Sequence, residues 1–301
     1  MTDYSRFLGD DTVAIFLFHG VIRRPRHAVR NYTRKHLPVG DFLTVLDELC
    51  AAGVPVSIPE LVAATRDGKS LPRRAFAVTF DDGFENNFSV VAPILTARGV
   101  PATFYVTTGF VGGNGCSWID RIEYAVEATA AFELALPFDD QPRRYETPEQ
   151  KRGLLETIRA VVKGDRTVDP EAVADEVWRQ LGVTGMALDP ELDRKLSWAQ
   201  VRELARHPLF TVGGHGHTHR ILEYLDQSDL EREVALSIEK LRANLAVPVE
   251  HYSYPEGLAT CYSERVIRTL KAHGIVCAPT AEPGTNRPGD DLFRLRRVMV
   301  A

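Results

Sequence analysis

Two adjacent carboxylates are the first residues in this sequence whose types and position could do chemistry. Asp81 and Asp82 follow an apolar stretch and precede Gly83. Side chains alternate in direction along an extended chain, so one carboxylate can bind a metal ion while the other faces a substrate. Two neighbouring carboxylates in a half-buried place are costly unless a cation or a proton compensates them. A helix N-cap is the alternative role, but it accounts for one aspartate and not for both.

Two histidines at ligand spacing form the second group. His215 and His219 lie four residues apart, and one helical turn would place both imidazoles on the same face. His217 falls off that face, so we do not predict it to be a ligand. Two histidines and one carboxylate hold zinc and leave one coordination position open for water. The alternative is a glycine-rich loop in which the histidines are polar side chains without a ligand role. That alternative does not explain why two of them lie four residues apart in a chain that also has the Asp81-Asp82 pair.

Short apolar runs alternate with helical patterns along most of the chain. Strands are predicted at 13–18, 75–80, 102–106, 210–212, 252–254 and 275–277, and helices at about 42–49, 87–98, 228–245 and 263–273. Strands that are apolar on both faces and alternate with helices indicate a parallel sheet covered on both sides. The candidate residues all follow strand ends, where a β/α barrel or a doubly wound sheet carries its active site, and the pattern leaves both architectures open.

The stretch 113–195 interrupts this alternation. It contains helical patterns at 119–131, 149–162 and 171–181 without convincing strands between them. We therefore predict a helical insertion within a single domain that spans residues 1–301. The insertion either covers the strand ends or packs at the periphery, and the sequence leaves both positions open.

The composition narrows the class of protein. The chain has 301 residues, of which 44% are hydrophobic and 26% charged, and a formal net charge of -5. These values suit a globular α/β protein and exclude a nucleic-acid partner held by phosphate neutralisation. The polar start and the short first apolar run predict a cytoplasmic protein without a membrane span. Four cysteines spread along the chain, without a Cys-x-x-Cys pair, predict free thiols.

The run Thr79–Gly83, followed by the spacing His215-x-x-x-His219, resembles the paired signature of polysaccharide deacetylases (carbohydrate esterase family 4, the NodB homology domain). The resemblance extends from about residue 13 to residue 298 outside the insertion. Further matches are Leu196–Trp198 and Pro101–Val106. This resemblance implies a distorted (β/α) barrel, a divalent metal that is commonly zinc, and an N-acylated amino sugar as the substrate.

The resemblance also implies roles for single residues. Asp81 matches the general base, and the three metal ligands are matched by Asp82, His215 and His219. Such a metal lowers the pKa of its water and polarises the amide carbonyl, while the base takes the proton. In this family the N–H that stabilises the oxyanion comes from the loop matching Ser253–Gly257. The substrate contacts predicted there are Tyr254, Pro255 and Glu256.

The sequence departs from the family pattern at this loop and at the C-terminus. Ser253 stands where the family often has the arginine that orients the base, and Glu256 stands where it has a tyrosine. The arginines that could replace the missing one are Arg294, Arg296 and Arg297. The usual C-terminal histidine, which acts as general acid, has no clear counterpart. His19 follows the first predicted strand and should lie at the same strand ends as the other candidates. We predict that it replaces the missing general acid, and a structural role is the alternative.

Two further features could contact a substrate. Trp118 could present its ring to a sugar, or it could anchor a helix to the barrel. A run of basic residues after the first strand could bind the phosphate of a nucleotide- or lipid-linked sugar, or could form a solvated loop. These basic residues are Arg23, Arg24, Arg26, Arg30, Arg34 and Lys35.

These features predict a metal-dependent hydrolase that removes an acetyl or formyl group from an amino sugar. The absence of an export signal favours a cytoplasmic precursor of a surface polysaccharide or lipopolysaccharide as the substrate. One alternative is a sugar-binding protein that keeps the metal site without activity, although Asp81 argues against it. The other alternative is a related amidohydrolase that works without a metal.

Overall fold

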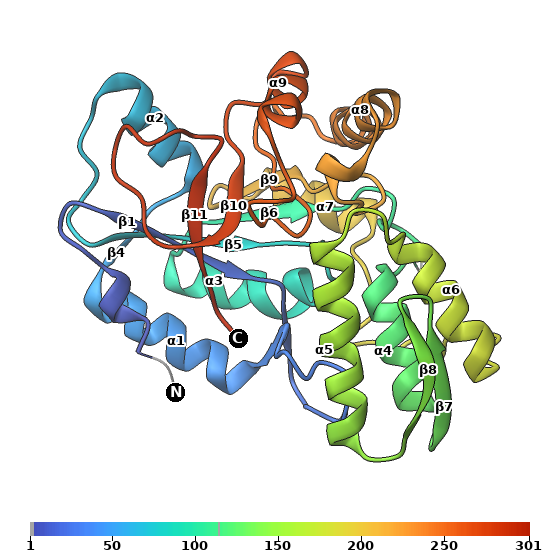
Figure 1. The fold of residues 1–301 in the computed structure, drawn as a ribbon. Coiled ribbons are helices and arrows are strands. Elements are labelled where there is room, and N and C mark those ends of the chain that lie inside the picture. Colours follow the sequence, from blue (N-terminus) through green and yellow to red (C-terminus); the bar gives the residue numbers. More distant parts are fainter. Residues whose placement is uncertain (1–2, 114) are drawn as a thin grey trace.

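The computed structural model describes residues 3–113 and 115–301, and a parallel sheet forms its centre (Figure 1). The strands of this sheet are β1 (Val13–Phe18), β4 (Val54–Pro55), β5 (Ala75–Phe80), β6 (Ala102–Val106), β9 (Phe210–Gly214), β10 (Pro279–Pro283) and β11 (Leu295–Met299). Their order is β10-β11-β1-β5-β6-β9, with β4 paired to β5, and every pair is parallel.

Two isolated bridges continue the sheet beyond β9 and close it. Gly214 pairs with Tyr252, and His251 pairs with Cys277, both in the parallel sense. The chain runs from Cys277 almost directly into β10, which pairs with β11. Together with the strand order, these bridges connect β9 back to β10 and close a distorted β/α barrel. The predicted fold class is therefore confirmed. In place of the strands predicted at 252–254 and 275–277, the structure has single bridging residues. Pro255 has no N–H to donate, so the pairing at Tyr252 cannot continue through it as a regular strand.

The strands align their carboxyl ends because their apolar residues pack in register. Every residue of β1, β5 and β6 is buried. Phe18 pairs with Phe80 and Phe80 with Phe104, and the three rings stack at centroid distances of 5.2 and 5.3 Å. The residues that follow these strands, His19 and Asp81, therefore emerge side by side at one rim.

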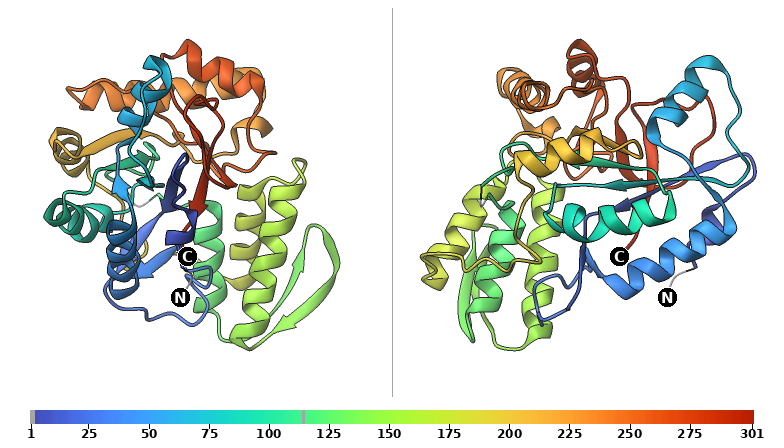
Figure 2. Two further views of the ribbon diagram at one scale, coloured as in Figure 1. Left: turned by 90° about the vertical axis from the view of Figure 1, so that its left-hand side faces the viewer. Right: turned by 180° about the vertical axis from the view of Figure 1, so that it is seen from behind.

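Helices cover the sheet on both sides (Figures 1 and 2). They are α1 (Val39–Ala52), α2 (Ile58–Asp67), α3 (Ala92–Arg98), α7 (Trp198–Arg206), α8 (Gln227–Asn244) and α9 (Glu264–Ala272). Shorter elements are η1 (Ser5–Phe7), β2 (Gly20–Ile22), β3 (His36–Pro38), the π-helical turn η2 (Asn87–Val91) and η3 (Leu222–Tyr224). Within the described part of the chain, no helix has the length and apolarity needed to cross a membrane.

Helix α2 was not predicted, although its start carries a recognisable signal. The Ser57 side chain accepts a hydrogen bond from the Glu60 backbone, and the Glu60 side chain accepts one from the Ser57 backbone. This capping box satisfies two N–H groups that a helix start otherwise leaves unpaired. The pattern Ser-x-x-Glu was therefore the available evidence for this helix.

The insertion lies at one end of the sheet and is not purely helical (Figure 2). Its helices α4 (Trp118–Ala128), α5 (Pro148–Gly164) and α6 (Pro170–Leu181) confirm the three predicted ones. Between α4 and α5, however, β7 (Phe132–Leu136) and β8 (Asp139–Tyr145) form an antiparallel hairpin, so the expectation of an insertion without strands was wrong. The three helices and β7 share a hydrophobic cluster of their own, separate from the clusters of the barrel.

Leu155 of α5 is fully buried within this cluster. We expect Leu155→Ala to lower the free energy of unfolding by about 3 kcal/mol, because the cavity left behind adds to the lost burial. Urea denaturation followed by circular dichroism measures this change. The exposed neighbour Glu156 offers a matched control, and Glu156→Ala is expected to stay within about 0.5 kcal/mol of the wild type. Equal stabilities of the two variants would contradict the prediction.

Candidate active site

The strand ends and the insertion enclose one cavity of about 280 Å³. The predicted site residues that line it are His19, Asp81, Asp82, His215, His219 and Glu256. Further lining residues come from the insertion (Ser117, Ile119, Arg159 and Lys163) and from the end of the described chain (Met299–Ala301). The insertion thus covers the strand ends, which was one of the two positions that the sequence left open.

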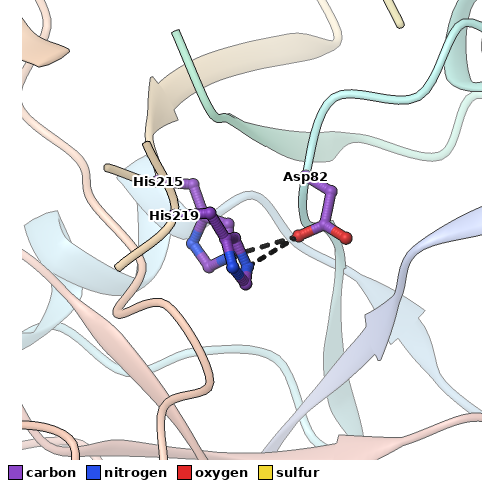
Figure 3. Close-up of side chains that lie close together, drawn as sticks. All are labelled: Asp82, His215 and His219. Atoms are coloured by element: carbon purple, nitrogen blue, oxygen red, sulfur yellow. Dashed lines mark ion pairs between the residues drawn. The ribbon is translucent and has the colours of Figure 1, made fainter. Parts of the chain in front are cut away.

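Asp82, His215 and His219 form a compact buried cluster (Figure 3). Asp82 Oδ1 lies 3.4 Å from His215 Nε2 and 3.2 Å from His219 Nε2. One possible ligand atom from each residue lies within 4.8 Å of the other two. The two imidazole nitrogens and this carboxylate oxygen therefore converge closely enough to bind a single metal ion.

The loop between the two histidines achieves this geometry without a helical turn. No helix is present there, and the predicted one-turn explanation of the spacing was wrong. Gly216 and His219 instead have positive φ angles of 77° and 63°, which reverse the chain. The Glu233 carboxylate accepts hydrogen bonds from the backbone N–H groups of His217 and Thr218, at 2.7 and 2.6 Å. A buried acid on α8 thus holds the loop in its strained shape.

The hydrogen bonds around the cluster leave its ligand atoms free for a metal. His215 Nδ1 donates to the Ser253 carbonyl oxygen at 2.9 Å, so its Nε2 carries the lone pair that faces Asp82. Asp82 Oδ1 is buried and has no hydrogen-bond partner among the described residues. Lys35 Nζ pairs with the other oxygen of this carboxylate, Oδ2, at 2.8 Å, so Oδ1 is the atom left to face a metal ion. The three residues therefore fit a divalent cation.

Asp81 is held by an arginine from the far end of the chain. Arg297 donates to both carboxylate oxygens of Asp81, at 2.9 and 2.7 Å, and its side chain is 1% exposed. Ser253 Oγ donates to the same carboxylate at 3.2 Å. Burial opposes the charge of Asp81, but the Arg297 guanidinium outweighs it and lowers the pKa of this carboxyl. Of the three arginines considered from the sequence, Arg297 is the one in contact.

Removing this arginine should destabilise the protein strongly. Arg297→Met leaves the buried Asp81 charge without its partner, and we expect the free energy of unfolding to fall by about 3–5 kcal/mol. The exposed neighbour Arg296 provides the control, because Arg296→Met removes the same charge outside the site. Chemical denaturation of both variants measures the difference. The double variant Arg297→Met with Asp81→Asn should recover part of the loss, and no recovery would contradict this explanation.

His19 lies at the rim, as its position after β1 requires, and lines the cavity. Burial lowers the pKa of its imidazole to about 4, against the opposing charge of Asp82. The imidazole is therefore neutral at neutral pH and must gain a proton before it can donate one. Its catalytic role stays a prediction.

The three residues of the Ser253–Gly257 loop that were predicted to contact substrate have different positions. Glu256 lines the cavity, has a positive φ of 61° and pairs with Lys163 Nζ at 2.5 Å. Tyr254 is fully buried, and its hydroxyl donates to the Phe293 carbonyl oxygen at 2.9 Å. Pro255 is also buried. Neither Tyr254 nor Pro255 is among the described residues of the cavity wall, so their side chains support the loop.

Trp118 and most of the basic run lie outside the cavity. Trp118 is 4% exposed within the hydrophobic cluster of the insertion, which favours its anchoring role over contact with a sugar. Arg30 pairs with Asp193, and Arg34 pairs with Asp41. Because these side chains pair with different acids in different places, the basic run does not gather into the predicted phosphate site. Lys35 is the member of the run that reaches the cavity wall.

Arg159 and Lys163 of α5 are wall residues that the sequence analysis missed. They lie four residues apart, so one helix face presents both cations. That spacing was the available signal, but it does not reveal which way the helix faces. The tertiary packing of the insertion decides this.

Residues 68–278 match the model of a family described as polysaccharide deacetylase. A relative from Escherichia coli (strain K12), poly-beta-1,6-N-acetyl-D-glucosamine N-deacetylase, is 46% identical over 161 residues. This match covers 54% of the present chain and 14% of the relative, well under two thirds of the relative's length.

Solved structures share the fold over almost the whole chain. IcaB from Ammonifex degensii has a TM-score of 0.61 and 19% identity, covering 97% of this chain and 93% of that one. The BpsB deacetylase domain from Bordetella bronchiseptica has a TM-score of 0.58 and 18% identity, covering 100% and 98%. Streptococcus pyogenes PplD in complex with acetate has a TM-score of 0.60 and 14% identity, covering 96% and 92%. At these identities the likeness shows the fold.

Proposed function

Because this chain belongs to the polysaccharide deacetylase family and is thus a hydrolase of amide bonds, we propose that it removes an acetyl or formyl group from an amino sugar with the help of bound zinc. The observation that carries the proposal is the buried cluster of Asp82, His215 and His219 beside Asp81. A metal site and an ionised carboxylate at one cavity are the two components that metal-assisted amide hydrolysis needs.

The residues around the cluster divide the work of the reaction. A divalent metal held by Asp82, His215 and His219 would polarise the amide carbonyl and activate the attacking water. Asp81 accepts the proton of that water, and Arg297 keeps its carboxylate ionised and oriented. The proton that Asp81 accepts then passes by way of His19 to the leaving amine. The C–N bond breaks, and the products are the acid and the free amino sugar.

The size of the cavity supports a small substrate. Its volume of about 280 Å³ lies just below the range typical of ligand pockets, roughly 300–1,000 Å³. We propose that the enzyme acts on a precursor of a surface polysaccharide or lipopolysaccharide, in which the amino sugar is linked to a nucleotide or a lipid. The cytoplasmic location remains a prediction, and fractionation of the producing cells tests it.

A substrate screen tests the proposed function. The purified protein is loaded with Zn²⁺ and incubated with N-acetylated and N-formylated amino sugars, free and linked, while acetate and formate are measured separately. We expect release of one of the two acids from at least one compound. Retained sugar binding without any acyl release would refute the hydrolase and favour the sugar-binding alternative. The absence of the family's arginine at Ser253 was one argument for that alternative, and it weakens because Arg297 contacts Asp81 instead.

A further inference from the structure

Three cationic side chains line the cavity of the cluster. Lys35 comes from the segment before β3, and Arg159 and Lys163 come from one face of α5. Their side chains are 17%, 19% and 26% exposed. The insertion therefore contributes two of the three positive charges in the wall.

Each of these cations already has an acidic partner. The partners are Asp82 for Lys35 (2.8 Å), Glu123 for Arg159 (2.7 Å) and Glu256 for Lys163 (2.5 Å). Arg297 pairs with Asp81 behind the wall, and Asp120 lies between Lys35 (3.4 Å) and Lys195 (3.8 Å). This ion-pair network of five cations and five acids is balanced without a metal.

A divalent cation at the cluster would upset this balance. It would add two positive charges to the network, and among the described residues no acidic side chain besides Asp81, Asp82 and Glu256 lines the cavity. Uncompensated charge in a largely buried place is costly, and a cavity with excess positive charge attracts an anion. The loaded site is therefore suited to a substrate that carries negative charge of its own.

Arg159 is the wall cation best suited to hold such a group. One of its terminal nitrogens donates to Glu123 at 2.7 Å, while the side chain lines the cavity and stays 19% exposed. A guanidinium presents its N–H groups in a planar fork that matches the oxygens of phosphate and carboxylate. Lys163, one turn further along α5, adds a second cation on the same side.

We propose that Arg159 and Lys163, together with Lys35, form a subsite for an anionic group on the amino-sugar substrate. This inference rests on the proposed function and specifies it: the sugar carries a phosphate or a carboxylate besides its acylated amine. The substrate then differs from a neutral N-acetylglucosamine polymer by this negative charge. Arg159 and Lys163 of α5 recognise the charge and so favour the anionic substrate.

Three probes that share one acetamide test the subsite. They are N-acetylglucosamine 1-phosphate, 2-acetamido-2-deoxyglucuronic acid and the neutral methyl glycoside of N-acetylglucosamine. Affinities are measured by calorimetry on the zinc-loaded full chain, and acetate release is followed in parallel. The two charged probes distinguish a phosphate from a carboxylate as the recognised group. We expect the wild type to bind at least one charged probe more tightly than the neutral one by about tenfold, the effect of one charge-assisted contact.

Arg159→Gln should abolish most of this preference, and Arg166→Gln is the matched control because Arg166 is exposed just beyond α5. If Arg159→Gln folds poorly, the double variant with Glu123→Gln removes the acid left unpaired. No binding of either charged probe, equal affinities in the wild type, or an equal loss for all probes in the variant would overturn the subsite.

The outcomes separate the subsite from the proposed function. Acetate release without charge preference overturns the subsite and leaves the hydrolase standing. Charge-dependent binding that Arg159→Gln removes, without release of acetate from these probes or of formate from their N-formyl counterparts, supports the subsite and counts against the proposed function.

Discussion

Asp81→Asn is expected to lower kcat for acyl release by about a thousandfold, while the protein keeps its divalent metal. The asparagine retains one oxygen that can accept a hydrogen bond from Arg297, but it cannot take the proton of the attacking water. The three residues of the metal cluster are unchanged, so their affinity for zinc should persist. Acetate or formate release gives the rate, and elemental analysis of the same preparation gives the metal content.

The control for this variant is Asp67→Asn, which removes an exposed carboxylate at the end of α2. It should retain both the rate and the metal. Wild-type turnover in Asp81→Asn would refute Asp81 as the base. Loss of metal in Asp81→Asn would instead assign this carboxylate to the metal site.

His215→Ala is expected to weaken zinc binding by more than about 100-fold. Replacing a residue that only hydrogen-bonds to a metal ligand already costs up to about 100-fold, and loss of a ligand itself should cost more. The substitution removes an imidazole whose Nε2 faces Asp82 Oδ1 at 3.4 Å. Titration of the metal-free protein with zinc against a chelating indicator measures the affinity. Activity should fall in parallel, since the remaining two residues do not complete the site.

His217 supplies a control two residues away. Its Nδ1 lies 3.0 Å from Thr108 Oγ1, and the residue is not part of the cluster. His217→Ala should therefore keep the wild-type affinity for zinc. Unchanged affinity in His215→Ala would favour the amidohydrolase that works without a metal.

The sequence was sufficient to locate the cluster because parallel strands end at a common rim. Buried apolar runs predicted the strands before Asp81 and His215, and their shared direction brought the following residues together. The conformation of the loop after β9 was not predictable from spacing alone. It depends on Glu233, which lies on another helix and binds the loop through backbone N–H groups.

The partner of Asp81 could be narrowed from the sequence but not chosen. Arg296 and Arg297 are neighbours in β11, and their side chains face opposite sides of the strand. The register of β11 against β1, in which Leu17 pairs with Met299, decides which of the two faces inward. That register is a long-range property of the sheet, which local patterns do not contain.

The hairpin of the insertion escaped prediction for a different reason. Strand β7 alternates buried Phe132 with exposed Glu133, a weak strand pattern over only five residues. Strand β8 is rich in polar residues and becomes a strand by pairing with β7. The same limit applies to Arg159, because helix periodicity shows which residues share a face but not what that face meets.

The position of the last residues has a practical consequence for purification. Met299–Ala301 line the cavity that holds the metal cluster. Any polypeptide appended after Ala301 starts at this cavity, and a tag of consecutive histidines there would bring extra imidazoles close to His215 and His219. Such a tag would compete for zinc and block the entry of a sugar. Zinc titrations and rate measurements should therefore use protein that carries no histidine tag directly after Ala301.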